Sequence, residues 1–219
     1  NEVNLPMHTM CPRLIKIVLC TLMTGLLMHV GISRSLHVGS GHPYVSVKEG
    51  IAAADQGDTV IIHAGTYKEG NIIVDKTITL MGMDWPVLDG QLKYEVLSVK
   101  ANNVVVTGLV VQNSGHASLD DPGGIKVYDS RGVHIIGNRL KDNFFGIYLQ
   151  YSKHCIIKDN IVKASGTEEQ QIGNGIHCWK SDSLQIVGNT ISGHRDGIYF
   201  EFVTGSVIWR NIAFDNIRY

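Results

Sequence analysis

The sequence predicts an all-β protein, a parallel β-solenoid in which short strands stack coil upon coil. Two patterns recur with the same intervals of 22, 29 and 22 residues: Gly-Ile begins at 124, 146, 175 and 197, and asparagine stands at 138, 160, 189 and 211. Apolar and polar residues alternate within each repeat, as they do in strands, and no repeat holds a helix-length amphipathic stretch. Strands this close in sequence, without helices between them, are expected to stack about 4.8 Å apart.

Residues 1–35 resemble an N-terminal extension that ends in an export signal. Arg13 and Lys16 precede an apolar run over residues 17–30, and Ser33 and Ser35 are the small residues that a signal peptidase would read. The run is shorter than the roughly 20 residues of a spanning helix, so an uncleaved anchor is the weaker alternative. We therefore expect one exported β-solenoid domain, residues 36–219, with no stable membrane span in the mature chain.

The two ends of the solenoid are expected to differ. Ser46 and Glu49 form a capping box before the stretch 50–54, which predicts a short helix that covers the first coil. Such a cap protects a terminal coil, which would otherwise offer an unpaired strand edge. At the other end the sequence stops at Tyr219, where a new coil should begin, and we interpret the chain as truncated at its C-terminus.

The repeated positions have structural reasons. Branched isoleucines are expected to fill two inward ladders, residues 135, 157, 186 and 208 in one and 125, 147, 176 and 198 in the other. The asparagines are expected at turns, where their amides can hydrogen-bond from coil to coil. Extra residues of the longer coils fall in loops at 118–124 and 166–172. Extending the frame backward by 29 residues places Val96 in the slot of Ile125 and Leu109 in that of Asn138.

Cys155 and Cys178 also fall at inward positions of the repeat. Free cysteine often packs as a small apolar side chain, so we interpret both as core residues in preference to a redox or metal pair.

The charge balance argues against a nucleic-acid partner. Lysine and arginine number 19 against 20 aspartates and glutamates, and no basic block exceeds two residues.

Outward residues form two columns on neighbouring coils, and they supply the candidate binding residues. One column holds Lys126, Tyr148, His177 and Tyr199, and the other holds Tyr128, Gln150, Trp179 and Glu201. We select Tyr148, His177, Trp179, Tyr199 and Glu201 as a partner-binding face, because amphipathic aromatics suit a protein partner or a sugar chain. The alternative is that the rings stack only to stabilise the sheet. We assign no catalytic residue, since Glu201 is the only acid in the columns and sugar hydrolysis needs two carboxylates roughly 5 to 10 Å apart.

Three segments carry a family resemblance: "DNFFGIYL" (142–149), "GNGIHCWKS" (173–181) and "GNTISGHRDGIYFEFVTGSVI" (188–208). In this order and spacing they resemble the NosD family of periplasmic accessory proteins, and the resemblance covers residues 42–219. It implies a right-handed parallel β-helix that works in the periplasm without enzymatic activity, in copper delivery and maturation of nitrous oxide reductase. The implied partners are ABC transporter subunits, the reductase and a copper chaperone. A carbohydrate-binding or carbohydrate-modifying β-helix is the alternative, because many sugar-acting proteins share the fold.

Copper binding would require imidazole or soft ligands. The histidines beyond the signal lie scattered in the sequence, at 37, 42, 63, 116, 134, 154, 177 and 194, without a His-x-His or His-x₃-His pair. Met81 and Met83 have strand spacing for two thioethers on one side, but a packing role in a turn is favoured. His177 is the best single candidate for a metal ligand. One imidazole does not make a tight site, so we expect copper binding by this chain to be weak, transient or absent.

Overall fold

A computed structural model describes residues 33–116, 121–166 and 169–218. The expected export signal over residues 17–30 lies outside this range. No helix among the described residues is long and apolar enough to cross a bilayer.

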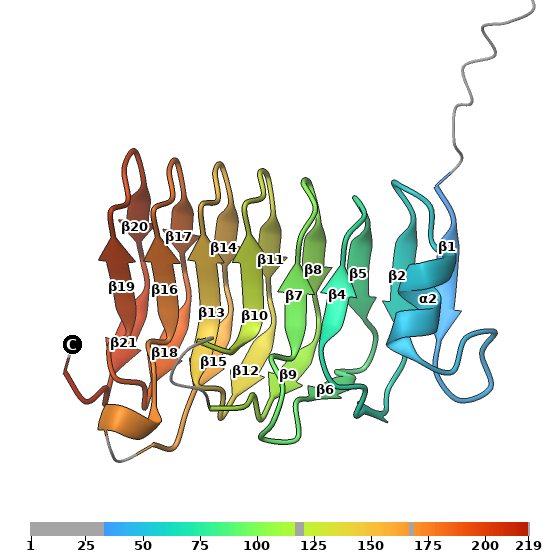
Figure 1. Cartoon of the computed structure of the whole chain (residues 1–219), viewed down its shortest axis with the longest axis horizontal. Helices are drawn as coiled ribbons and strands as arrows, with labels where there is room; N and C mark the ends of the chain where they lie inside the picture. The colour runs from blue at the N-terminus through green and yellow to red at the C-terminus, as the bar shows by residue number, and fades with distance from the viewer. Residues whose placement is uncertain (1–32, 117–120, 167–168, 219) are drawn as a thin grey trace, which may run out of the picture. The chain divides into compact units, whose positions relative to one another are not determined.

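Three parallel sheets make up the described chain, which is a right-handed parallel β-helix (Figure 1). Each coil contributes one strand to each sheet, and consecutive coils lie side by side. Sheet A contains β1 (Ser35–Val38), β2 (Thr59–Ile62), β5 (Thr79–Gly82), β8 (Val105–Thr107), β11 (His134–Ile136), β14 (Ile156–Lys158), β17 (Gln185–Val187) and β20 (Val207–Trp209). Sheet B contains β3 (Thr66–Tyr67), β6 (Val87–Asp89), β9 (Val110–Gln112), β12 (Arg139–Lys141), β15 (Ile161–Lys163), β18 (Thr190–Ser192) and β21 (Ile212–Phe214). Sheet C contains β4 (Ile72–Val74), β7 (Leu97–Val99), β10 (Gly123–Tyr128), β13 (Phe145–Gln150), β16 (Ile176–Trp179) and β19 (Ile198–Glu201).

The strand register confirms the predicted repeat. Ile125 pairs with Ile147, Ile147 with Ile176 and Ile176 with Ile198, so the Gly-Ile intervals are the lengths of the coils. The backward extension is correct in one slot and wrong in the other. Leu109 occupies the slot of Asn138, whose side chain accepts a hydrogen bond from the Leu109 backbone, but Leu97 and not Val96 pairs with Ile125.

The glycines before the isoleucines stand in a column because a side chain would strike the next coil. A Cβ on Gly124 would lie 3.0 Å from the carbonyl oxygen of Gly146, and one on Gly175 would lie 2.8 Å from that of Gly197. The aligned backbones therefore approach too closely for any other residue.

The asparagine ladder is the polar counterpart of the isoleucine ladders. Nδ2 of Asn160 donates to Oδ1 of Asn189 at 2.9 Å, and Oδ1 of Asn160 accepts from the Asn138 backbone at 2.9 Å. The same pattern joins Asn189 to Asn211. Since Asn138, Asn160 and Asn189 are fully buried, these bonds satisfy polar groups that would otherwise be costly to desolvate.

Apolar residues of the three sheets fill the core, with one exception among the predicted ladders. Ile135, Ile157 and Ile186 are fully buried, whereas Ile208 is 50% exposed because β20 has a neighbour on one side only. Cys155 and Cys178 are buried free thiols, which confirms their interpretation as core residues.

The cap of the first coil is the helix α2 (Val47–Ala53), which begins with the expected capping box of Ser46 and Glu49. Its buried residues Val47 and Ile51 belong to the core cluster. In the longer coils, the predicted loop 166–172 contains a 3-10 turn, η2 (Glu169–Gln171), while residues 123–124 of the other predicted loop belong to β10.

Candidate functional site

The two predicted columns lie side by side on the outer face of sheet C. Tyr148 pairs with His177 and His177 with Tyr199, while Gln150 pairs with Trp179 and Trp179 with Glu201. The register thus brings the five candidate residues together on three neighbouring strands.

The expectation of solvent exposure is wrong for two of them. Tyr148 is only 6% exposed and His177 only 8%, because the ring of Phe145 packs at 5.2 and 5.1 Å from theirs. Burial raises the pKa of Tyr148 to about 12. Burial, together with the charges of Arg195 and Lys126, lowers the pKa of His177 to about 4. These rings form the base of the face, and the Nδ1 atom of His177 lies 3.0 Å from the amide of Asn174.

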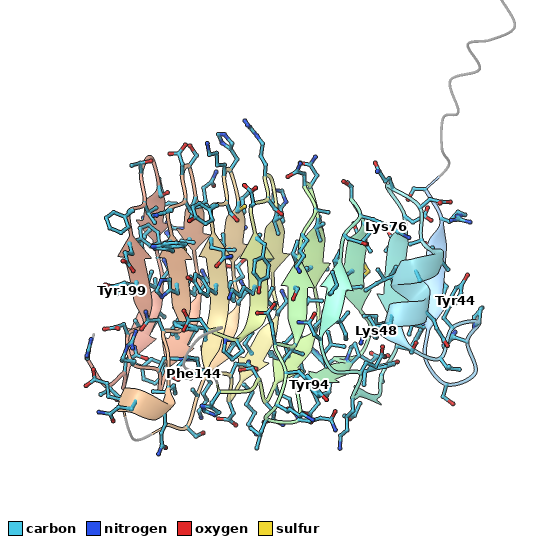
Figure 2. The ribbon with its side chains drawn as sticks, viewed as in Figure 1. Tyr44, Lys48, Lys76, Tyr94, Phe144 and Tyr199 are labelled. Atoms are coloured by element: carbon cyan, nitrogen blue, oxygen red, sulfur yellow. The ribbon has the colours of Figure 1, made fainter. Side chains whose placement is uncertain are left out.

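The accessible part of this face is a group of aromatic side chains, Tyr151, Trp179, Tyr199 and Phe202, which we call the aromatic surface. Tyr199 is 39% exposed, and it projects from β19 (Figure 2). The rings of Tyr151 and Trp179 meet edge to face at 4.9 Å, and the ammonium of Lys180 lies 4.5 Å from the Trp179 ring.

Sequence reasoning missed Tyr151 and Phe202. They follow β13 and β19 directly and adopt positive φ angles of 52° and 53°, so they lie outside the alternation that defines a strand. Both belong to the turn position after the predicted column, which repeats at the same coil interval.

The stretch 193–203 is a rung of the solenoid, although its charged residues suggest a site. His194 and Asp196 are buried, and the Arg195 guanidinium donates to Asn174 at 3.2 Å and to Asp196 at 3.3 Å. Burial lowers the pKa of His194 to about 4. These three residues tie one coil to the loop of the preceding coil.

A polar cavity of about 560 Å³ lies in the same sheet, beside β7 and β10. Its only acidic lining residue is Glu95, which accepts hydrogen bonds from Ser98 and from the Tyr128 hydroxyl and lies 3.9 Å from the Lys126 ammonium. Within the described lining there is no second carboxylate, so the pair that glycoside hydrolysis requires does not form here.

A separate cluster of histidines lies on the outer side of sheet A. His37 belongs to β1, His63 follows β2, and His42 lies in the turn between β1 and α2 that Tyr44 ends (Figure 2). The rings of His42 and His63 stack with centroids 3.7 Å apart, and Nδ1 of His37 lies 2.8 Å from Nε2 of His63. Among the described residues, this is the one group of three histidine, cysteine, aspartate or glutamate side chains that could share a metal ion.

Backbone hydrogen bonds fix the positions from which these rings project. The Gly39 amide donates to Tyr44 at 2.8 Å and closes the turn that holds His42. The His63 amide donates to Val38 at 2.9 Å, and its carbonyl accepts from the Tyr67 hydroxyl at 2.8 Å. A Cβ on Gly39, whose φ is +142°, would lie 3.2 Å from that of His63, so glycine leaves the space between the rings open.

Burial lowers the pKa of His63, and the neighbouring His42 and His37 lower it further, while Asp84 opposes the shift. The cluster therefore favours neutral imidazoles, whose free nitrogens can bind a metal.

The idea that the histidines are scattered is thus wrong for three of them. Ser35 pairs with Thr59, so the first coil is 24 residues long and sets His63 diagonally opposite His37 on the next strand. Extending the repeat frame by two further coils would have revealed this. Met81 and Met83 lie on the following coil, both exposed, and the Met83 amide donates to Ile62, the residue before His63. His177, the earlier candidate, is not part of the cluster.

Comparisons with known proteins agree with the architecture. A family model described as periplasmic copper-binding protein (NosD) matches residues 56–219. The probable ABC transporter binding protein NosD of Stutzerimonas stutzeri is 25% identical over 137 residues, which are 61% of this chain and 31% of that relative. The chain therefore matches about a third of the relative's length.

Solved structures with a similar fold include pectin methylesterases. The carrot enzyme is 16% identical, with a TM-score of 0.39 over 84% of this chain and 89% of its own. The Aspergillus niger enzyme is 12% identical, with a TM-score of 0.38 over 78% and 85%. Nothing about activity follows from similarities this low. Because the family model matches well over half of its residues, the chain belongs to the NosD family.

Proposed function

We propose that this protein is a non-enzymatic accessory factor in the periplasm that takes part in copper delivery and maturation of nitrous oxide reductase. An ABC transporter is its first expected partner, and the reductase and a copper chaperone are the others. Family membership supports the copper and transporter parts of the proposal, and the name of the Stutzerimonas relative agrees with the second. The signal expected within residues 1–35 would export the β-helix domain.

The observation that carries the proposal is the aromatic surface on a rigid sheet. Large aromatic side chains with a cationic neighbour are the usual anchors of protein interfaces. The underlying rings of Tyr148 and His177 are locked by packing, so the accessible rings of Trp179 and Tyr199 project from a support that does not reorganise. A preorganised surface loses little conformational entropy on binding. Glu201, half-buried beside Trp179, supplies a charge at the same position.

The test is capture of the transporter and the reductase by the full-length protein. The double variant Trp179→Ala with Tyr199→Ala should lose at least about 10-fold in affinity, since interface anchors typically cost 2 kcal/mol or more each. Tyr94→Ala is the matched control, because Tyr94 is comparably exposed, at 36%, but lines the polar cavity. Undiminished capture by the double variant, with its melting temperature unchanged, would refute the assignment of this surface.

Carbohydrate binding is a second candidate, and the polar cavity is the observation that favours it. Lys93, Lys100 and Lys126 line the cavity with Glu95 as the only acid, so an acidic oligosaccharide would match its charge. Calorimetric titration with oligogalacturonate tests this, and Lys100→Ala should weaken any binding. Heat of binding in the wild type that the lysine variant abolishes would favour this candidate over the accessory role.

A further inference from the structure

The histidine cluster is a metal site in all but its ion. We propose that His37, His42 and His63 bind one copper ion through their ring nitrogens. The choice of copper as cargo rests on the proposed function, but the site itself rests on the arrangement of the three rings.

The ring nitrogens are within reach of a single ion. One nitrogen from each ring lies within 4.8 Å of the others, and the closest pair, between His37 and His63, is 2.8 Å apart. Imidazole nitrogens bind a metal at about 2.0–2.1 Å, which sets two of them roughly 3.3–3.5 Å apart on one ion. Rotations about the side-chain bonds supply the difference, so the strands that carry the rings need not move.

The donor set selects the class of metal. Neutral imidazoles suit copper and zinc, whereas calcium and magnesium require oxygen ligands. No carboxylate or thiolate of the described residues joins the three rings as a potential shared ligand. Copper(II) binds nitrogen ligands more tightly than zinc does, and copper(I) accepts three-coordinate sites that zinc leaves incomplete.

The site is also open enough for an ion that must be passed on. His37, His42 and His63 are all partly exposed, and three protein ligands leave one coordination position for an incoming or departing donor. The cluster lies on sheet A and the aromatic surface on sheet C, so a partner can hold one while the other remains accessible.

The experiment measures copper binding by the purified mature protein. Cu(I) affinity is measured anaerobically by competition with a chromogenic chelator, and nitrogen ligands of Cu(II) are counted from the superhyperfine structure of the electron paramagnetic resonance spectrum. The expected result is one ion per chain and a three-nitrogen signal. His63→Phe keeps an aromatic ring stacked on His42 but removes both nitrogens, and it should weaken binding by about 100-fold or more.

Two controls keep the result interpretable. His134→Phe removes a partly exposed histidine from β11 of the same sheet and should leave copper affinity unchanged. His42→Phe should reproduce the loss in a second position, and thermal melting shows that both variants are folded. Wild-type protein without a stoichiometric copper site, or His63→Phe with wild-type affinity, would overturn the proposal. Displacement of Cu(I) by equimolar zinc would overturn the assignment of copper.

The outcomes separate this site from the proposed function. A protein that captures its partners but binds no copper refutes the site alone. A protein that binds copper through the three histidines but captures neither transporter nor reductase refutes the accessory role alone.

Discussion

Removal of one amide from the asparagine ladder should destabilise the protein far more than removal of a surface asparagine. Asn160 makes four hydrogen bonds: Oδ1 accepts from the backbone and Nδ2 of Asn138 at 2.9 and 3.1 Å, and Nδ2 donates to Ile135 and Asn189 at 2.9 Å each. A neutral hydrogen bond contributes about 0.5–1.5 kcal/mol net, so Asn160→Ala should lower the free energy of unfolding by about 4 kcal/mol. For a domain of this size that corresponds to roughly 8–16 °C in melting temperature.

The assay is thermal and urea denaturation of Asn160→Ala beside Asn102→Ala. Asn102 is exposed, and its side chain accepts a single hydrogen bond, from the Arg131 backbone at 2.7 Å, so its loss should cost less than about 1 kcal/mol. Equal losses in the two variants would show that water replaces the ladder bonds, and the reasoning about buried amides would fail.

Three further predictions concern a glycine, a histidine and the N-terminal arginine. Gly175→Ala should cost more than about 2 kcal/mol, because its Cβ would press on the carbonyl of the next coil, whereas Gly123→Ala, with no atom closer than 3.6 Å, should be nearly neutral in urea denaturation. The pKa of His194 is about 4 in the folded protein against roughly 6.5 unfolded, so the unfolded chain binds the extra proton between these values. The free energy of unfolding should therefore fall by up to ~3 kcal/mol as pH drops from 6.5 to 4, and His194→Phe should remove that part of the pH dependence in denaturation at pH 7 and pH 5. Arg34 forms a two-pronged contact with the buried carboxylate of Asp58 at 2.7 and 3.1 Å and, with backbone amides, holds the Asp58 pKa at about 2, so N-terminal sequencing of the exported protein should find Arg34 retained; a mature chain that starts at residue 36 and melts at the same temperature would contradict this.

The repeat was readable because a solenoid is nearly one-dimensional. Each coil contacts only its neighbours, so the interval between Ile147 and Ile176 in the sequence is also their separation by one coil in space. For this reason the inward isoleucines, the asparagine ladder, the core cysteines and the outward column of Tyr148, His177 and Tyr199 could all be predicted before any coordinates.

Exposure was harder to predict than direction. Alternation assigns Tyr148 and His177 to the outer face, and they do point there, but Phe145 and the residues of the longer coil cover them. The covering residues come from irregular segments, whose path depends on packing and on turn geometry and leaves no periodic signal.

The sequence by itself determined the solenoid, its family resemblance and the residues of the outer columns, because these follow from a period that each coil repeats locally. Only the tertiary structure decided that His177 is buried, that Tyr151 and Phe202 join the accessible rings, and that His37, His42 and His63 meet. The physical reason is that these features depend on turns and on early coils of unequal length. There the hydrogen bonds of individual residues, such as Gly39 with Tyr44, fix which side chains become neighbours.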